Sequence, residues 1–296
     1  MDYLKRLSRL QGSAKVLEIG DSSRIVLMSD CHRGDGGHAD TFLRNRNMYL
    51  AALQYYDTGK YTYIELGDGD ELWENRSLAA IVDAHADVFE RLSSFIRDGR
   101  FYSLRGNHDA QRTAGRYVPA PVRSLARGRL ITRFQLLKTY DSIRLVYGNT
   151  GRDILLVHGH QADFLNSTLW KLARWLVRYL WRPLEIFGVN DPTSAAKNDV
   201  RRKQTEQRLI RWVSENRRML IAGHTHRPVF AAMGAPPYFN DGSCVHPACV
   251  TAIEITDGSI ALVKWCVKVR ADGVLYVGRD IIAGPAPLAD WFGLTR

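Results

Sequence analysis

The sequence of 296 residues predicts a mixed α/β sandwich. In its first third, short apolar runs with the length of buried strands alternate with amphipathic segments of helical period, and later runs come in pairs joined by turn residues. In addition, a short polar motif follows five of the runs. Ligands of open α/β sheets gather beyond the carboxyl ends of the strands, so we expect these five motifs to meet at one edge.

The first third of the chain supplies the strand–helix alternation. Apolar runs at 24–29, 61–66 and 101–104 are the predicted strands. Between them, residues 40–57 and 77–98 place apolar side chains three and four positions apart, which is typical of helices that bury one face.

The rest of the chain supplies hairpins. A turn signal, Gly148-Asn149-Thr150-Gly151, separates two apolar runs, and Asp257-Gly258 separates two more, as expected for β-hairpins. The predicted strands of this part are 143–147 with 153–157, the single strand 219–222, and 251–255 with 260–265.

Each of the five motifs is rich in oxygen and imidazole ligands. They are Asp30-Cys31-His32, Gly67-Asp68, Gly106-Asn107-His108-Asp109, His158-Gly159-His160 and Gly223-His224-Thr225-His226. Asp30 and His32 lie two positions apart in an extended segment, so their side chains project to the same side. Gly67 allows the backbone to turn tightly in front of Asp68.

A row of such ligands at strand ends predicts a metal cluster. Two cations about 3.5–4 Å apart, bridged by a carboxylate and each held by two or three further ligands, are the arrangement that metal-assisted phosphoryl chemistry requires. Mixed nitrogen and oxygen donors suit manganese, iron, zinc or cobalt better than calcium or magnesium. The candidate ligands are Asp30, His32, Asp68, Asn107, His158, His224 and His226.

The charge of the chain fits an anionic ligand. The net charge is +10, and the basic surplus lies between residues 100 and 218, around three of the motifs. A positive field at this place attracts phosphate-bearing ligands or an anionic membrane surface. Alternatively, the arginines are simply solvated on helix surfaces.

The cysteines and the N-terminal residues favour a cytoplasmic location. Cys31, Cys244, Cys249 and Cys266 do not form a disulfide-framework pattern, and Cys31, between two stronger ligands, is expected to point into the core. Residues 1–11 lack the apolar centre of a secretory signal, and we find no run of about 18 uncharged apolar residues that would span a membrane.

Together the motifs resemble those of the calcineurin-like metallophosphoesterases. That family's motifs read D-x-H, G-D-x-x-D/E, G-N-H-D/E, a single H after a strand, and G-H-x-H. The chain matches them from about residue 24 to residue 265, with Glu71 completing the second motif and Asn240-Asp241-Gly242-Ser243 resembling the N-x-G-S element of the family. The resemblance implies a single domain over residues 1–296, built as a four-layer α-β-β-α sandwich of two mixed sheets.

The resemblance also implies a role for each motif residue. One metal would be held by Asp30, His32, Asp68 and His226, and the other by Asp68, Asn107, His158 and His224. Asp68 would bridge the two divalent cations, for which manganese is the first expectation and iron or zinc the alternatives. His108 would face the substrate as a catalytic acid, and Asp109 would orient it.

The implied activity is hydrolysis of a phosphomonoester, a phosphodiester or a pyrophosphate. Hydroxide held by the cations would attack phosphorus in line, and His108 would donate a proton to the leaving oxygen. Arg33 and Arg105 flank two of the motifs and are either phosphate contacts or solvated structural residues.

Residues 162–216 are predicted to form a helical insert or lid, since 65 residues separate His158 from His224. The segment 165–187 is apolar around most of its girth except for one basic stripe. The stripe consists of Lys171, Arg174, Arg178 and Arg182. Such a helix needs cover, either over the active site, on a membrane surface, in a dimer interface or in an ordinary core.

The insert resembles the lid of the UDP-diacylglucosamine pyrophosphatases. This likeness suggests an amphiphilic substrate, a lipid-linked or nucleotide-sugar diphosphate, and peripheral contact with an anionic membrane. The chain departs from that group at His108, where arginine is expected, and at His160, where aspartate is expected.

Two other functions stay open at this point. One is a nuclease of the same fold, because the middle of the chain is basic, although we expect no nucleic-acid partner in the absence of a recognisable module. The other is a protein that uses the fold only for binding. The sequence leaves the oligomeric state undetermined.

Overall fold

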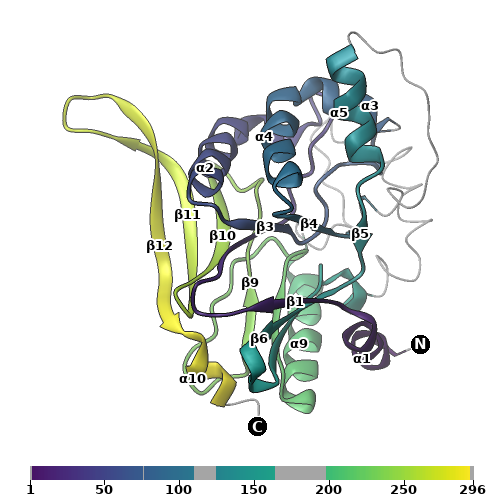
Figure 1. Ribbon diagram of the computed structural model, residues 1–296, viewed down its shortest axis with the longest axis vertical. Helices are drawn as coiled ribbons and strands as arrows, with labels where there is room; N and C mark the ends of the chain where they lie inside the picture. The colour runs from purple at the N-terminus through teal and green to yellow at the C-terminus, as the bar shows by residue number, and fades with distance from the viewer. Residues whose placement is uncertain (1, 76, 110–124, 164–197, 294–296) are drawn as a thin grey trace.

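Two β-sheets lie face to face between two layers of helices in the computed structural model, which describes residues 2–75, 77–109, 125–163 and 198–293 (Figure 1). Both sheets are mixed. The architecture is therefore the four-layer α-β-β-α sandwich that the motifs predicted.

The smaller sheet has five strands in the order β1-β6-β7-β8-β9. Only the hairpin strands β6 and β7 are antiparallel, and the other neighbours are parallel. The strands are β1 (Lys15–Ile19), β6 (Ile143–Tyr147), β7 (Arg152–Leu156), β8 (Met219–Ala222) and β9 (Tyr238–Asn240).

The larger sheet has seven strands in the order β12-β11-β10-β2-β3-β4-β5. The run from β2 to β5 is parallel, and β10, β11 and β12 are antiparallel to their neighbours. The strands are β2 (Arg24–Met28), β3 (Thr62–Glu65), β4 (Phe101–Leu104), β5 (Thr139–Tyr140), β10 (Cys249–Thr256), β11 (Ser259–Val269) and β12 (Leu275–Pro287).

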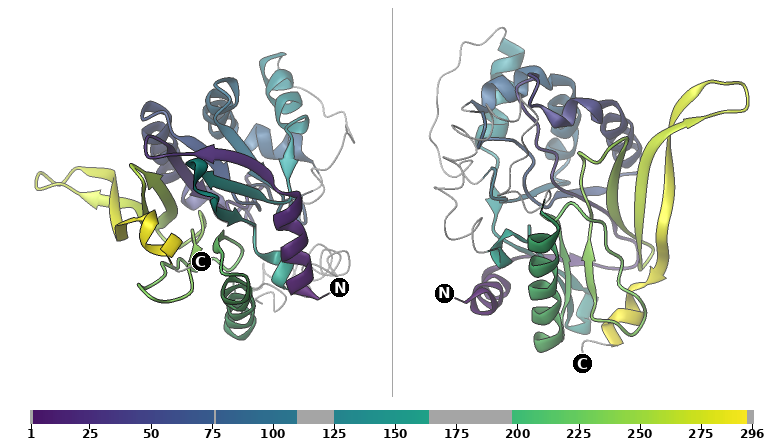
Figure 2. Two further views of the ribbon diagram at one scale, coloured as in Figure 1. Left: turned by 60° about the horizontal axis from the view of Figure 1, so that its bottom comes forward. Right: turned by 180° about the vertical axis from the view of Figure 1, so that it is seen from behind.

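Helices cover the outer face of each sheet (Figure 2). On the larger sheet they are α2 (Arg46–Thr58), α3 (Leu78–Ala84), α4 (Ala86–Arg97) and α5 (Leu125–Gln135). On the smaller sheet they are α1 (Tyr3–Ser13) and α9 (Asp199–Asn216). A short helix, α10 (Leu288–Phe292), packs its apolar side chains into the core between the sheets.

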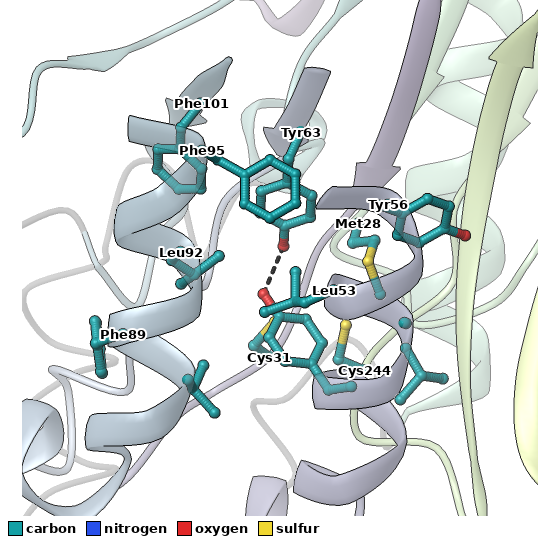
Figure 3. Close-up of a cluster of buried hydrophobic side chains, with 14 of the residues drawn as sticks. Met28, Cys31, Leu53, Tyr56, Tyr63, Phe89, Leu92, Phe95, Phe101 and Cys244 are labelled. Carbon is teal, nitrogen blue, oxygen red and sulfur yellow. Dashed lines mark hydrogen bonds between the residues drawn. The ribbon is translucent and has the colours of Figure 1, made fainter. Parts of the chain in front are cut away.

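Central strands are apolar on both faces, which is why the sequence shows them as continuous apolar runs. In β2, Ile25 and Leu27 belong to the core between the sheets, whereas Val26 and Met28 belong to the core under the helices. Figure 3 shows Met28 within this second core.

All eight predicted strands are present, and the last of them extends to Val269. The predicted helix 40–57 begins as a short 3-10 helix, η1 (Thr41–Arg44), and continues as α2. The prediction of one helix over 77–98 is wrong, because the chain divides into α3 and α4 at His85. There the buried imidazole Nε2 lies 2.7 Å from Oδ2 of Asp40, and the backbone leaves the helical conformation (φ −117°, ψ 38°).

The predicted insert, 162–216, is described only at its ends. Residues 164–197 lie outside the described residues, and the segment 165–187 with its basic stripe lies among them. The C-terminal part of the predicted insert is α9, whose Trp212 is buried against the smaller sheet in a cluster that includes Tyr238. Among the helices that the structure describes, none combines the length and the apolar character that crossing a membrane requires.

Candidate metal centre

The five motifs meet at the carboxyl ends of strands from both sheets. Beyond β2 and β3 the two chain segments continue side by side, since the amides of Asp30 and His32 donate to the carbonyls of Gly67 and Asp68 at 3.1 and 2.9 Å. The motifs after β7 and β8 are joined in the same way by a backbone hydrogen bond of 2.9 Å. Backbone hydrogen bonds at this edge of the sandwich therefore hold these motifs in place independently of their side chains.

Five of the seven predicted ligands have a left-handed backbone. Their φ angles are 51° at Asp30, 47° at His32, 50° at Asp68, 68° at His224 and 53° at His226. Asp and His adopt this conformation more readily than most residues. It still costs about 1–3 kcal/mol per residue, and such strain clusters at functional sites.

Several motif glycines leave no room for a side chain, among them Gly67 and Gly106. A Cβ atom on Gly106 would lie 2.0 Å from Oδ1 of Asp68, and one on Gly67 would lie 2.7 Å from Nδ1 of His158. Gly67 also has a φ of +101°. Glycine is thus required at Gly67 and at Gly106, each of which lies against a predicted ligand.

The first group of converging ligands consists of Asp30, His32 and His226. Oδ1 of Asp30 lies 3.1 Å from Nε2 of His226 and 3.7 Å from Nε2 of His32. These two imidazole nitrogens are themselves 3.3 Å apart. Nε2 of His158 lies 4.0 Å from the same carboxylate oxygen, so Asp30 also faces the second group.

The second group consists of Asp68, His158 and His224, with Asn107 beside it. Nε2 of His158 lies 3.0 Å from Oδ2 of Asp68 and 3.2 Å from Oδ1 of Asn107. Nδ1 of His158 lies 2.8 Å from the carbonyl oxygen of Leu66, which fixes the orientation of the ring. All seven predicted ligands are therefore brought together.

The chemistry of these side chains fits two divalent cations. Carboxylate, amide and imidazole atoms converge from both sheets, and this donor set suits transition metals. Nε2 of His224 is buried without a hydrogen-bond partner among the described residues, and the carboxylate oxygen Oδ2 of Asp163 is 3.5 Å away. Oδ1 of Asp30 faces imidazoles of both groups. The role of Asp68 as the carboxylate that bridges the two cations stays a prediction.

His108 lies at the rim of the centre and is held by two contacts. Its ring stacks on Trp73 with the ring centroids 4.2 Å apart. Its Nδ1 lies 2.7 Å from Oε2 of Glu71, and the same oxygen lies 2.8 Å from Nδ1 of His32. One carboxylate thus orients a predicted ligand and the predicted acid together.

Asp109 has a different position from the one predicted. Its carboxylate accepts hydrogen bonds from the amides of Gly106, at 2.7 Å, and Gly69, at 3.2 Å, and so joins the second and third motifs. The carboxylate within hydrogen-bond distance of His108 Nδ1 is that of Glu71, so the orienting role passes from Asp109 to Glu71. The motif spacing indicated Glu71 as a motif residue but did not indicate that it contacts His32 and His108. Nothing in the sequence indicated Trp73 as a site residue.

The ionisable groups of the centre shift one another's pKa values. Burial alone would raise the pKa of Asp30 and Asp68, but neighbouring imidazoles lower both. Burial lowers the pKa of His158, whereas the charges of Asp68 and Asp30 raise it to about 9. The carboxylates thus attract positive charge into a buried site, and a cation can replace the protons there.

Asp241, from the late Asn240-Asp241-Gly242-Ser243 element, supports Asp30 from behind. Oδ2 of Asp30 accepts hydrogen bonds from the hydroxyl of Ser29 and from the amide of His224, the latter at 2.8 Å. Oγ of Ser29 also lies 2.8 Å from Oδ1 of Asp241. Burial and the charge of Asp30 raise the pKa of Asp241 well above its usual value.

Arg33 is not available as a phosphate contact, which corrects the prediction for this residue. Its side chain is fully buried, with the guanidinium 2.8 Å from Oε1 of Glu65 and 2.7 Å from Oδ1 of Asp70. Arg105 is partly exposed and forms an ion pair of 2.7 Å with Asp141. Arg33 is therefore structural, although buried rather than solvated.

Known proteins provide an independent comparison. A model of the calcineurin-like phosphoesterase family matches residues 23–228. Two crystal structures of Vps29 from Chaetomium thermophilum, one in complex with a cyclic peptide, resemble this chain at 13% sequence identity, with TM-scores of 0.40 and 0.37, and the match covers 88% of this chain and 96% of theirs. No curated protein matches the sequence.

Proposed function

Because the chain belongs to the calcineurin-like phosphoesterase family, we propose that it hydrolyses phosphate esters or pyrophosphates with the help of two divalent cations. One observation carries the proposal. Each of the two ligand groups brings three ligand atoms, from carboxylates and imidazoles, within 4.8 Å of one another, and both groups lie at the same edge of the sandwich. Manganese is the first candidate for both cations, with iron or zinc as alternatives.

In the proposed mechanism the chain holds the cations and supplies a proton. When bound, the two cations lower the pKa of a water molecule and neutralise charge on the phosphoryl oxygens. Asp30, His32 and His226 would hold one of them, and Asp68, Asn107, His158 and His224 the other. Asp68 is proposed as the bridging carboxylate.

His108 is the proposed acid for the leaving oxygen. Its side chain is 21% exposed, so a substrate can reach it. Burial lowers its pKa, but the charges of Glu71 and Asp68 raise it above the ordinary histidine value. A protonated imidazole near neutral pH is the form that can donate a proton. Trp73 and Glu71 fix the ring for this transfer.

The substrate is proposed to carry phosphate and an apolar part. The basic surplus of the chain between residues 100 and 218 favours an anion. The preference for an amphiphilic substrate, a lipid-linked or nucleotide-sugar diphosphate, and for peripheral contact with an anionic membrane depends on the sequence of residues 165–187.

The test is a comparison of substrates and of two variants. With manganese added, the protein is assayed on an aryl phosphate monoester, an aryl diester, a nucleotide-sugar diphosphate, a lipid diphosphate and DNA. His108→Ala should lower turnover about 100-fold or more while metal content is unchanged. Asp68→Ala should lose both turnover and bound metal.

The remaining outcomes decide against the proposal. Turnover restricted to DNA would identify a nuclease, and no turnover of any substrate by the metal-loaded protein would identify a protein that only binds. Two equivalents of metal retained by Asp68→Ala would contradict the bridging assignment.

A further inference from the structure

The four cysteines of the chain lie in two spatial pairs, which their sequence spacing does not reveal. Cys31 and Cys244 are buried together under the helices, where both are seen in Figure 3. Cys249 and Cys266 are directly opposite each other on β10 and β11, and both are partly exposed. The second pair is therefore the one that a small molecule in solution can reach.

The hairpin geometry brings the side chains of Cys249 and Cys266 close together. The turn between β10 and β11 has two residues, Asp257 and Gly258, with φ of 50° and 67°, as in a type I′ turn. In such a hairpin the pair that closes the turn is hydrogen-bonded, and the pairs alternate from there along the ladder. Counted back along the register, the two cysteines form a pair without hydrogen bonds between them.

This type of pair has the dimensions of a disulfide. Cα atoms of antiparallel residues without mutual hydrogen bonds are about 4.5 Å apart, with their side chains closest. Disulfides join Cα atoms about 4.4–6.8 Å apart. No movement of the backbone is therefore needed to join Cys249 to Cys266.

The surroundings hold both residues in place. The carbonyl of Cys249 accepts a hydrogen bond of 3.1 Å from Nδ2 of Asn45, and Sγ of Cys266 donates to Oδ2 of Asp280 at 3.8 Å. Beyond the two cysteines, the hairpin of β11 and β12 extends away from the rest of the molecule (Figures 1 and 2). Within the part of the chain that the structure describes, both cysteines are partly exposed, so a reagent can meet them without displacing a described helix or strand.

We propose that Cys249 and Cys266 are a redox-active dithiol, which a small-molecule disulfide such as oxidised glutathione converts into a cross-strand disulfide. The thiolate of one cysteine attacks the glutathione disulfide and releases one glutathione. The other cysteine then attacks the mixed disulfide and releases the second. The two thiol protons end on two glutathione molecules, and two electrons pass from the protein to the oxidant.

The reaction is expected to be slow at neutral pH. Burial raises the pKa of the Cys249 thiol, while the neighbouring Lys264 acts to lower it. Since only the thiolate attacks, the minor ionised form limits the rate. Minutes to hours of exposure are the appropriate time scale.

The experiment measures the crosslink directly in the full-length chain. Reduced protein is incubated with oxidised glutathione, remaining thiols are alkylated, and tryptic fragments are analysed by mass spectrometry. Cleavage after Lys264 and Lys268 places Cys266 in a four-residue fragment. We expect this fragment joined to the one that contains Cys249, two thiols lost per chain, and full reversal by dithiothreitol.

Matched variants assign the partners. Cys249→Ser and Cys266→Ser should each abolish the crosslink. Because the fragment with Cys249 also contains Cys244, the control is Cys244→Ala, which should keep it. Two thiols that stay fully alkylatable in the wild-type protein would overturn the proposal, as would a glutathione on each cysteine without a crosslink, or a crosslink lost in Cys244→Ala.

Discussion

Substitution of Gly106 by alanine is the most direct test of how the loops are fitted beneath the ligands. The added Cβ would lie 2.0 Å from Oδ1 of Asp68, 2.3 Å from its backbone nitrogen and 2.7 Å from its Cγ. A side-chain oxygen could rotate away, but the backbone nitrogen cannot, because this loop is tied to the His32 backbone by a hydrogen bond of 2.9 Å. The second and third motifs must therefore separate.

The expected loss of stability in Gly106→Ala follows from the insertion of one methyl group into a packed interior, which typically costs about 1–3 kcal/mol. For a chain of this size each kcal/mol lowers the melting temperature by about 2–4 °C, so Gly106→Ala should lower it by about 2–12 °C. Because Asp68 and Asn107 are displaced together, the variant should also lose bound metal. Thermal unfolding followed by circular dichroism, with chelator and with manganese, measures both effects.

The matched control is the same substitution at Gly12, where the added Cβ meets no atom within 4 Å. Gly12 lies in α1, and alanine in a helix is more favourable than glycine by about 0.5–1 kcal/mol, so Gly12→Ala should be neutral or slightly stabilising. If Gly106→Ala melted like the wild type and kept two equivalents of metal, the loops would not be in contact as described. The geometry of the centre would then be refuted.

Glu71 and Arg33 carry buried charges close to the centre, and each charge can be removed by a single substitution. Glu71→Gln removes the charge that raises the pKa of His108. With protonated His108 as the acid, turnover falls as pH rises through the pKa of His108, so the variant should show the alkaline limb of its pH–rate profile at lower pH than the wild type. An unchanged alkaline limb would exclude His108 as the acid. In the wild-type protein the guanidinium of Arg33 lies 2.8 and 2.7 Å from two buried carboxylates. Arg33→Met leaves both carboxylates without this cation, which should lower the free energy of unfolding by about 3–5 kcal/mol, as measured by urea denaturation of the metal-free protein. A loss below about 1 kcal/mol would contradict a structural role for Arg33.

The strands that surround the centre could be predicted from the sequence because they are buried on both faces. β2, β4 and β8 consist almost entirely of buried residues, and each ends at a ligand motif. Local composition is sufficient in such cases, since an apolar run of this length has few other structures available. The ligand motifs could be predicted for the same reason, as each follows directly from a strand that was itself recognisable.

Elements that depend on distant partners could not be predicted. β12 contains Gly278, Gly284, Pro285 and Pro287 and has mostly exposed or partly exposed side chains, so only its pairing with β11 makes it a strand. β1 and β5 are likewise short and only partly buried. In each case the stabilising contact comes from a neighbouring strand rather than from the segment itself.

The side-chain contacts between motifs of the centre could not be predicted from the sequence either. The sequence placed both Glu71 and Asp109 in motifs, but not the choice of Glu71 as the partner of His108. That choice depends on how the second and third motifs pack together, where the amides of Gly106 and Gly69 both donate to the carboxylate of Asp109. Similarly, Arg33 follows a ligand in sequence, yet its guanidinium turns under the loops to Asp70 because its backbone pairs with that residue.

The backbone itself gives an argument for a cation site that is independent of motif matching. Nine non-glycine residues have positive φ in the described part of the chain, and five of them are predicted ligands. Each such residue costs about 1–3 kcal/mol, and the five predicted ligands concentrate this strain at one edge of the sandwich. Strained loops persist when surrounding structure determines them, and here the hydrogen bonds between the first two motifs do so. Because a bound cation stabilises only the folded state, its binding offsets this cost.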